Sequence, residues 1–253
     1  MNDNNKDQNT ITGHLTELRS RLIKSLVFIF VIFILGYIFA EYIYNFLLEP
    51  YAKAVKNDGI ERRLIFTALH ETFITYLKLA FFVSLLLGSP IFLTQMWKFI
   101  APGLYKNEKK ALLPYLVATP ILFLLGGMLV YYLVMPLAIK FFLTFETTGN
   151  INNLPIQLEA KVNEYLSLIM RLIFAFGLSF QLPVLLNLLA RIGAIDSKYL
   201  KERRRYFIVI IFAAAAILTP PDPITQIGLA IPLLILYELS ILSVKLTEKK
   251  NNA

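Results

Sequence analysis

The chain has 253 residues, of which 57% are hydrophobic and only 17% are charged, and it carries a net charge of +8. A soluble domain has about 25% charged residues, and the apolar residues here form long unbroken runs instead of alternating with polar ones. The basic residues gather in short segments between these runs, which excludes a nucleic-acid-binding role, and the absence of cysteine excludes disulfides.

Six apolar runs predict an all-α, polytopic membrane protein forming one integral membrane domain over residues 1–253. The fifth run has about 14 residues and would reach only ~21 Å, less than the ~30 Å hydrocarbon core. Prolines within the runs predict kinked helices and a cupped bundle. The predicted spans are 22–46, 73–97, 113–141, 165–190, 206–219 and 224–244.

Most of the 25 Lys and Arg residues fall at the N-terminus, after spans two and four, and in the C-terminal tail. Excess positive charge marks the cytoplasmic side, so we expect both termini to be cytoplasmic. The two long segments on the opposite side, 45–72 and 143–164, are predicted to fold into caps. The polar, acid-containing start is unlike a cleavable signal peptide.

No catalytic constellation is visible in the sequence. The motifs of nucleotide sites are absent, and the two histidines, His14 and His70, are predicted to lie on opposite sides of the membrane. We therefore expect neither an enzyme nor a metal or other cofactor. Lys78, Arg171 and Glu238 lie within spans, and we assign them no role.

Two acidic residues lie in predicted cytoplasmic segments that are otherwise basic. Glu17 in "HLTELRSRL" is spaced to form an i,i+4 ion pair with Arg21, and Glu108 in "LYKNEKK" is flanked by lysines. Each residue alone is well explained as a solvated charge. Together, two carboxylates held apart also form a natural receptor for two guanidinium groups.

Polar residues near the ends of later spans offer two further candidates. Gln181 in "FGLSFQLPV" requires either a partner on a neighbouring helix or a water-filled groove. Asp222 before Pro223 in "LTPPDPITQ" is typical of a helix N-cap. Thr219 and Gln226 are polar residues on either side of this cap, and helix capping does not explain why they are there.

The segments "HLTELRSRL", "LLEPY", "QMWKFIAPGLYKNEKK", "FGLSFQLPV" and "LTPPDPITQ", in this order across nearly the whole chain, resemble the TatC subunit of the twin-arginine protein translocase. The resemblance implies a receptor core in the cytoplasmic (inner) membrane. It would bind twin-arginine signal peptides of folded precursors, recruit single-span subunits of the TatA/TatB type within an oligomeric complex, and use the proton motive force. It also implies that the fifth and sixth helices are short.

The resemblance places several residues. The signal-peptide site falls on Glu17 and Glu108, with Arg19 and Phe99 nearby, and Pro50 falls in the outer cap. Partner docking is implied around Thr219, Asp222 and Gln226. Gln181 departs from the family, which often has glutamate at this position, so a titratable groove carboxylate is in doubt.

Three other classes of protein remain as alternatives. A secondary transporter of a small solute would explain kinked helices and polar residues at membrane depth, but we find no internal repeat. An enzyme would need a nucleophile–base pair, and a passive assembly scaffold would not depend on paired arginines.

Overall fold

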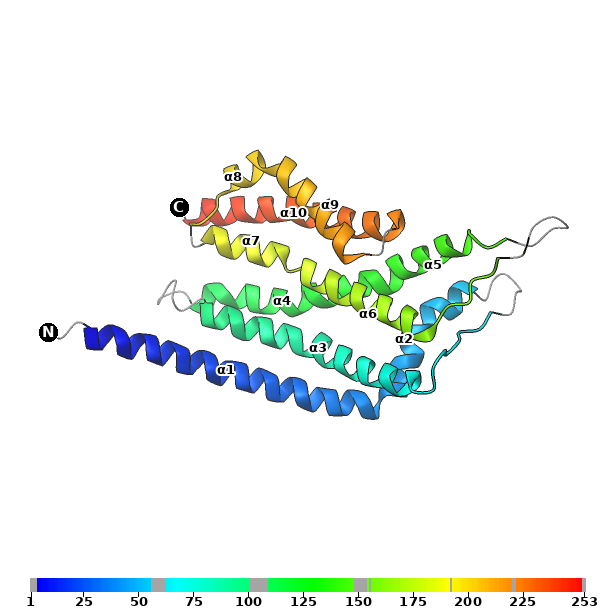
Figure 1. Cartoon of the computed structure of the whole chain (residues 1–253). Helices are drawn as coiled ribbons and strands as arrows, with labels where there is room; N and C mark the ends of the chain where they lie inside the picture. Colours follow the sequence, from blue (N-terminus) through cyan, green and yellow to red (C-terminus); the bar gives the residue numbers. More distant parts are fainter. Residues whose placement is uncertain are drawn as a thin grey trace. The chain divides into compact units, whose positions relative to one another are not determined.

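A computed structural model describes residues 4–55, 62–100, 109–147, 154, 156–191, 193–219 and 222–251. This part of the chain is helical, as predicted, with two isolated β-bridges (Figure 1). The helices are α1 (Asn4–Ile38), α2 (Ala40–Val55), α3 (Glu71–Ile100), α4 (Lys109–Leu129), the π-helix η3 (Val130–Val134), α5 (Met135–Leu143), α6 (Val162–Ser179), α7 (Leu182–Arg191), α8 (Ser197–Glu202), α9 (Arg204–Leu218) and α10 (Pro223–Asn251).

Five stretches are long and apolar enough to cross a membrane: Leu18–Ile38, Glu71–Met96, Pro114–Leu143, Val162–Arg191 and Pro223–Leu246. The predicted fifth span corresponds to α9, whose 15 residues reach only ~22 Å. The described part of the chain thus has five long candidate spans and, at the position of the predicted fifth span, the short helix α9, which together come close to the predicted six. The prediction of a short fifth helix is confirmed.

Two predicted boundaries are wrong. The first apolar run predicts a helix that continues to Phe46, but α1 ends at Ile38 and residues 40–46 belong to α2. Hydropathy does not reveal a break between two helices that are both apolar. The sixth helix is not short: α10 has 29 residues, because it continues past its apolar part, where Glu248 accepts hydrogen bonds from the backbone and side chain of Ser197.

Prolines explain two irregularities of the long spans. Pro136 has no N–H for the carbonyl of Tyr132, and the wide π-turn η3 comes immediately before α5, where Pro136 lies. Pro183 likewise has no N–H to donate to the carbonyl of Ser179. The fourth predicted span is interrupted nearby, at Phe180–Gln181, between α6 and α7.

The chain forms two compact units, residues 1–43 with 76–120 and residues 44–75 with 121–253. In the first unit, α1 packs against α3 through small residues: a Cβ built on Gly36 would lie 3.3 Å from the backbone of Ala80. In the second unit, α4 and α6 approach so closely that a Cβ on Gly126 would lie 2.7 Å from the carbonyl oxygen of Phe176. Close backbone approach at small residues is the usual way that membrane helices pack.

Candidate functional sites

The first candidate site lies on the α1–α3 pair, where the resemblance places signal-peptide binding. The side chain of Arg21 on α1 donates a hydrogen bond of 2.9 Å to Oε1 of Gln95 on α3. Arg21 also accepts, at its carbonyl, a hydrogen bond from Ser25. The sequence pattern indicates Glu17 as the partner of Arg21 and gives Gln95 no role, although Gln95 begins the "QMWKF" segment.

Three contacts fix the antiparallel register of α1 and α3. Gly36 lies against Ala80, Gly88 lies against Ile29, and Arg21 lies against Gln95. Moving from Gly36 to Arg21 goes back 15 residues along α1, and moving from Ala80 to Gln95 goes forward 15 residues along α3. One more turn of this register places position 17 of α1 opposite position 99 of α3, and both helices extend that far.

The predicted receptor residues are only partly described. Arg19 is exposed on α1. The backbones of Glu17 and Phe99 are helical, but their side chains lie outside the described part, as does all of Glu108. The register therefore brings together the backbone positions of two of the four predicted residues.

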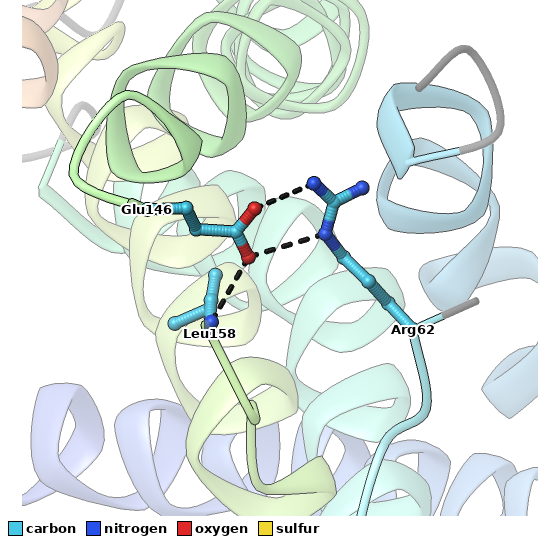
Figure 2. Close-up of polar contacts among 3 residues, drawn as sticks. All are labelled: Arg62, Glu146 and Leu158. Carbon is cyan, nitrogen blue, oxygen red and sulfur yellow. Dashed lines mark hydrogen bonds and ion pairs between the residues drawn. The ribbon is translucent and has the colours of Figure 1, made fainter. Parts of the chain in front are cut away.

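The second candidate site is the cap, which we define as α2 with residues 62–70 and the described residues between 144 and 161. Arg62 donates to both carboxylate oxygens of Glu146, through Nε at 3.1 Å and Nη2 at 2.5 Å (Figure 2). The amide of Leu158 donates to the same carboxylate at 2.9 Å. Both charged side chains are buried, at 2% and 13% exposure, and hydrogen bonding to Arg62 lowers the pKa of Glu146.

Backbone bridges join the same segments. Ile65 donates to the carbonyl of Ala160 and accepts from the amide of Val162, at 3.2 Å each. Thr147 and Ile156 exchange a pair of hydrogen bonds of 2.9 and 3.1 Å. The two long segments predicted to form caps are therefore tied to each other by main-chain bonds and by a buried ion pair.

Pro50 explains a further set of contacts in the cap. As residue 50 has no N–H, the carbonyl of Phe46 loses its helical donor, and the proline ring crowds the preceding turn. Tyr131 Oη of η3 donates to the carbonyl of Phe46 at 2.8 Å. Tyr165 of α6 donates to the next carbonyl, that of Leu47, at 3.0 Å. Two tyrosine hydroxyls thus satisfy acceptors around the proline, which gives the buried Pro50 a structural role in holding α2 against the bundle.

The third candidate site is the turn between α9 and α10. Asp222 caps α10 as predicted: its carboxylate accepts from the amide of Thr225 at 2.7 Å and from the hydroxyl of Thr225 at 2.5 Å. Thr219 is buried and donates to the carbonyl of Ala215 at 2.8 Å. Of the three predicted docking residues, only Gln226 is partly exposed, so the other two shape the turn.

Gln181 is buried where α6 gives way to α7. Its Nε2 is 3.5 Å from the carbonyl of Gly177, one turn earlier. Its burial agrees with the alternative of a polar role inside the packed bundle, and the role of Gln181 in a groove stays a prediction.

These helices and their apolar surfaces define a multi-pass α-helical membrane protein. The sequence model of the family described as Sec-independent protein translocase protein (TatC) matches residues 13–232. The chain therefore belongs to the TatC family of protein translocase components. Its membership gives no support to the alternative of a small-solute transporter.

Individual relatives agree over nearly the full length. The chain is 48% identical to the Sec-independent protein translocase protein TatC of Magnetococcus marinus, over 99% of this chain and 89% of the relative. It is 36% identical to that of Escherichia coli, over 93% and 88%. A crystal structure of the twin-arginine translocase receptor TatC superposes with a TM-score of 0.75 at 38% identity, covering 92% of this chain and 98% of that one.

Proposed function

We propose that this chain is the receptor core of a twin-arginine translocase and that it recognises signal peptides bearing paired arginines. The family membership and the likeness to the crystal structure of a twin-arginine translocase receptor support this assignment. The observation that carries the location of the site is the α1–α3 register, which places positions 17 and 99 opposite each other.

Glu17 and Glu108 are the proposed acceptors for the two guanidinium groups of the peptide. A hydrogen bond to a charged group contributes about 1.5–3 kcal/mol before solvent exposure reduces it. The planar guanidinium can bind a carboxylate through two parallel N–H groups, whereas a lysine ammonium cannot. Two such contacts would select Arg–Arg over Lys–Lys peptides, with Arg19 and Phe99 beside them.

The site would face the cytoplasm. The distribution of Lys and Arg supports cytoplasmic N- and C-termini in the inner membrane, and Glu17 lies close to the N-terminus. A peptide bound there is on the side where precursors are made, and the proton motive force would drive export from that side.

The turn joining α9 and α10 is the proposed docking place for single-span subunits of the TatA/TatB type. The side chain of Asp222 and that of Thr219 hold the turn in shape, and the partly exposed Gln226 is the residue able to contact a partner helix. The short α9 would thin the bilayer locally beside that partner. We expect several copies of the chain in such a complex.

The test is binding of a photo-reactive Arg–Arg signal peptide, and of its Lys–Lys version, to membranes containing the chain. Glu17→Ala and Glu108→Ala should each weaken crosslinking of the Arg–Arg peptide about tenfold, because each removes one charge-assisted contact. Glu202→Ala, which removes an exposed carboxylate from α8, is the control and should bind normally. Unchanged crosslinking in both glutamate variants would overturn the proposed site.

A further inference from the structure

A pocket of about 260 Å³ opens on the cap, between α2 and the end of the span formed by η3 and α5. Its lining includes Glu49 and Lys53 of α2, and Tyr131, Tyr132 and Lys140 of η3 and α5. Two ammonium groups and one carboxylate give this lining a net positive charge. The volume is just below the ~300–1,000 Å³ of pockets for drug-sized ligands, so it suits a small charged group.

Two of the three charged side chains of the pocket, those of Glu49 and Lys53, contact each other. The hydroxyl of Tyr131 has one proton, and two acceptors share it: the carbonyl of Phe46 at 2.8 Å and Oε2 of Glu49 at 3.0 Å. Oε1 of Glu49 lies 2.6 Å from Nζ of Lys53. The hydrogen bond to Lys53 lowers the pKa of Glu49 most, and the hydrogen bond to Tyr131 lowers it further. The π-turn therefore fixes Glu49, which in turn fixes one of the two ammonium groups.

The Lys140 end of the pocket reaches the depth of the lipid headgroups. The span Pro114–Leu143 has 30 residues and is ~45 Å long, against ~30 Å of hydrocarbon and ~40–45 Å for the bilayer with its headgroups. Its last turns, which carry Lys140, must therefore reach the polar layer. The side chain of Tyr132, further back along the span, is 70% exposed, so the pocket is open along this side as well.

Two exposed apolar side chains directly follow the lining residues Tyr132 and Pro136 in the sequence. Leu133 and Leu137, on the same η3–α5 segment, are both exposed large apolar side chains. A ligand that joins an anionic group to a long apolar part would use both surfaces at once. A free anion would use only the lysines.

We propose that this pocket binds the phosphodiester of an anionic phospholipid, between Lys53 and Lys140, with the acyl chains lying along Leu133 and Leu137. The lipid belongs to the leaflet on the side of the cap. This proposal does not depend on signal-peptide recognition at Glu17 and Glu108, because the pocket belongs to the other compact unit.

The experiment is native mass spectrometry of the purified full chain mixed with phosphatidylglycerol or with phosphatidylcholine. The wild-type chain should retain phosphatidylglycerol preferentially, and Lys140→Gln should retain about fivefold less of it, as expected for the loss of one lysine near an anionic lipid. Lys161→Gln is the matched control, because Lys161 is a cap lysine with a 44% exposed side chain outside this pocket.

Lys53→Gln provides a second variant and should give a loss of the same direction as Lys140→Gln. Equal lipid retention by Lys140→Gln and Lys161→Gln would overturn the proposal. Displacement of phosphatidylglycerol by millimolar inorganic phosphate would also overturn it, because the pocket would then be a site for a free anion.

Discussion

The α1–α3 pair and the cap are built in opposite ways. The α1–α3 pair carries three of the four residues proposed for recognition, Glu17, Arg19 and Phe99. It is held by small residues and by a side-chain hydrogen bond that is only partly buried. The cap is held by a buried ion pair, main-chain bridges and two tyrosine hydroxyls.

This difference separates recognition from support. A receptor surface needs accessible charged groups, whose removal costs little stability. A structural element such as the cap relies on buried polar groups whose partners are all present, and removing one partner strongly lowers its stability. Variants in the cap should therefore change stability, whereas variants of Glu17 and Glu108 should change binding.

The largest expected effect is that of Glu146→Gln. It leaves the guanidinium of Arg62 buried without its carboxylate, which should lower the free energy of opening of the cap by about 3–5 kcal/mol. Hydrogen exchange at the amides of Leu158 and Val162 measures this loss. Glu159→Gln, which changes an exposed carboxylate in the same segment, is the control. Equal exchange in both variants would show that the ion pair does not hold the cap.

Gly126→Ala should have the next largest effect. Its Cβ would meet the backbone oxygen of Phe176 at 2.7 Å, and a backbone atom in a packed helix cannot easily move away. We expect a loss of about 1–3 kcal/mol in thermal unfolding in detergent. Gly228→Ala is the control, since its Cβ would meet the side chain of Val134 at an ordinary 3.6 Å. A Gly126→Ala protein as stable as the Gly228→Ala protein would contradict the close α4–α6 approach.

Tyr131→Phe should cost about 1 kcal/mol. The variant keeps the ring, which stacks on Phe46, but it removes the donor for the carbonyl that Pro50 leaves free. Protease sensitivity of α2 reports the loss. Tyr132→Phe, which changes the exposed neighbouring ring, should behave as the wild type. The same sensitivity in both would remove the proposed link between Pro50 and Tyr131.

Acid should weaken the cap more than the α1–α3 pair. The pKa of Glu146 is lowered in the folded chain, so its contribution to stability is complete above the ordinary Glu pKa of ~4.3. It declines as the pH falls from there through the lowered value, because the unfolded chain then binds more protons. Hydrogen exchange at the amides of Leu158 and Val162 between pH 6 and pH 3, corrected for the intrinsic exchange rate, should follow this course in the wild type and depend less on pH in Glu146→Gln, where Glu49 of α2 is the cap carboxylate whose lowered pKa still contributes. A flat wild-type profile would contradict the assignment.

The sequence predicted the helical class, the short α9 and the Asp222 cap because each depends on local composition or on one residue type. It did not predict the break after Ile38, since both flanking helices are apolar. The length of α10 was also missed, because Glu248 is stabilised by Ser197, which is distant in sequence.

The cap contacts could not have been predicted from the sequence. Arg62 and Glu146 have the pattern of ordinary loop charges, and nothing in their spacing indicates that they meet. Pro50 shows from the sequence that one helical carbonyl lacks its usual donor, because a proline within a helix has no N–H. The sequence does not show which residue bonds to that carbonyl, since Tyr131 lies 85 positions from Phe46 in the chain. Glu17 and Glu108 stand as predictions from the resemblance, and the register of α1 on α3 concerns only the backbone position of Glu17.

That register can be tested directly because the chain has no cysteine. The measurement is crosslinking of the double variant Glu17→Cys with Phe99→Cys by a short bismaleimide in native membranes. Glu17→Cys with Ile91→Cys, two turns away on α3, serves as the control. The register predicts efficient crosslinking of positions 17 and 99 and little crosslinking of positions 17 and 91. The reverse result would separate Glu17 from Phe99 and contradict a single receptor site on these two helices.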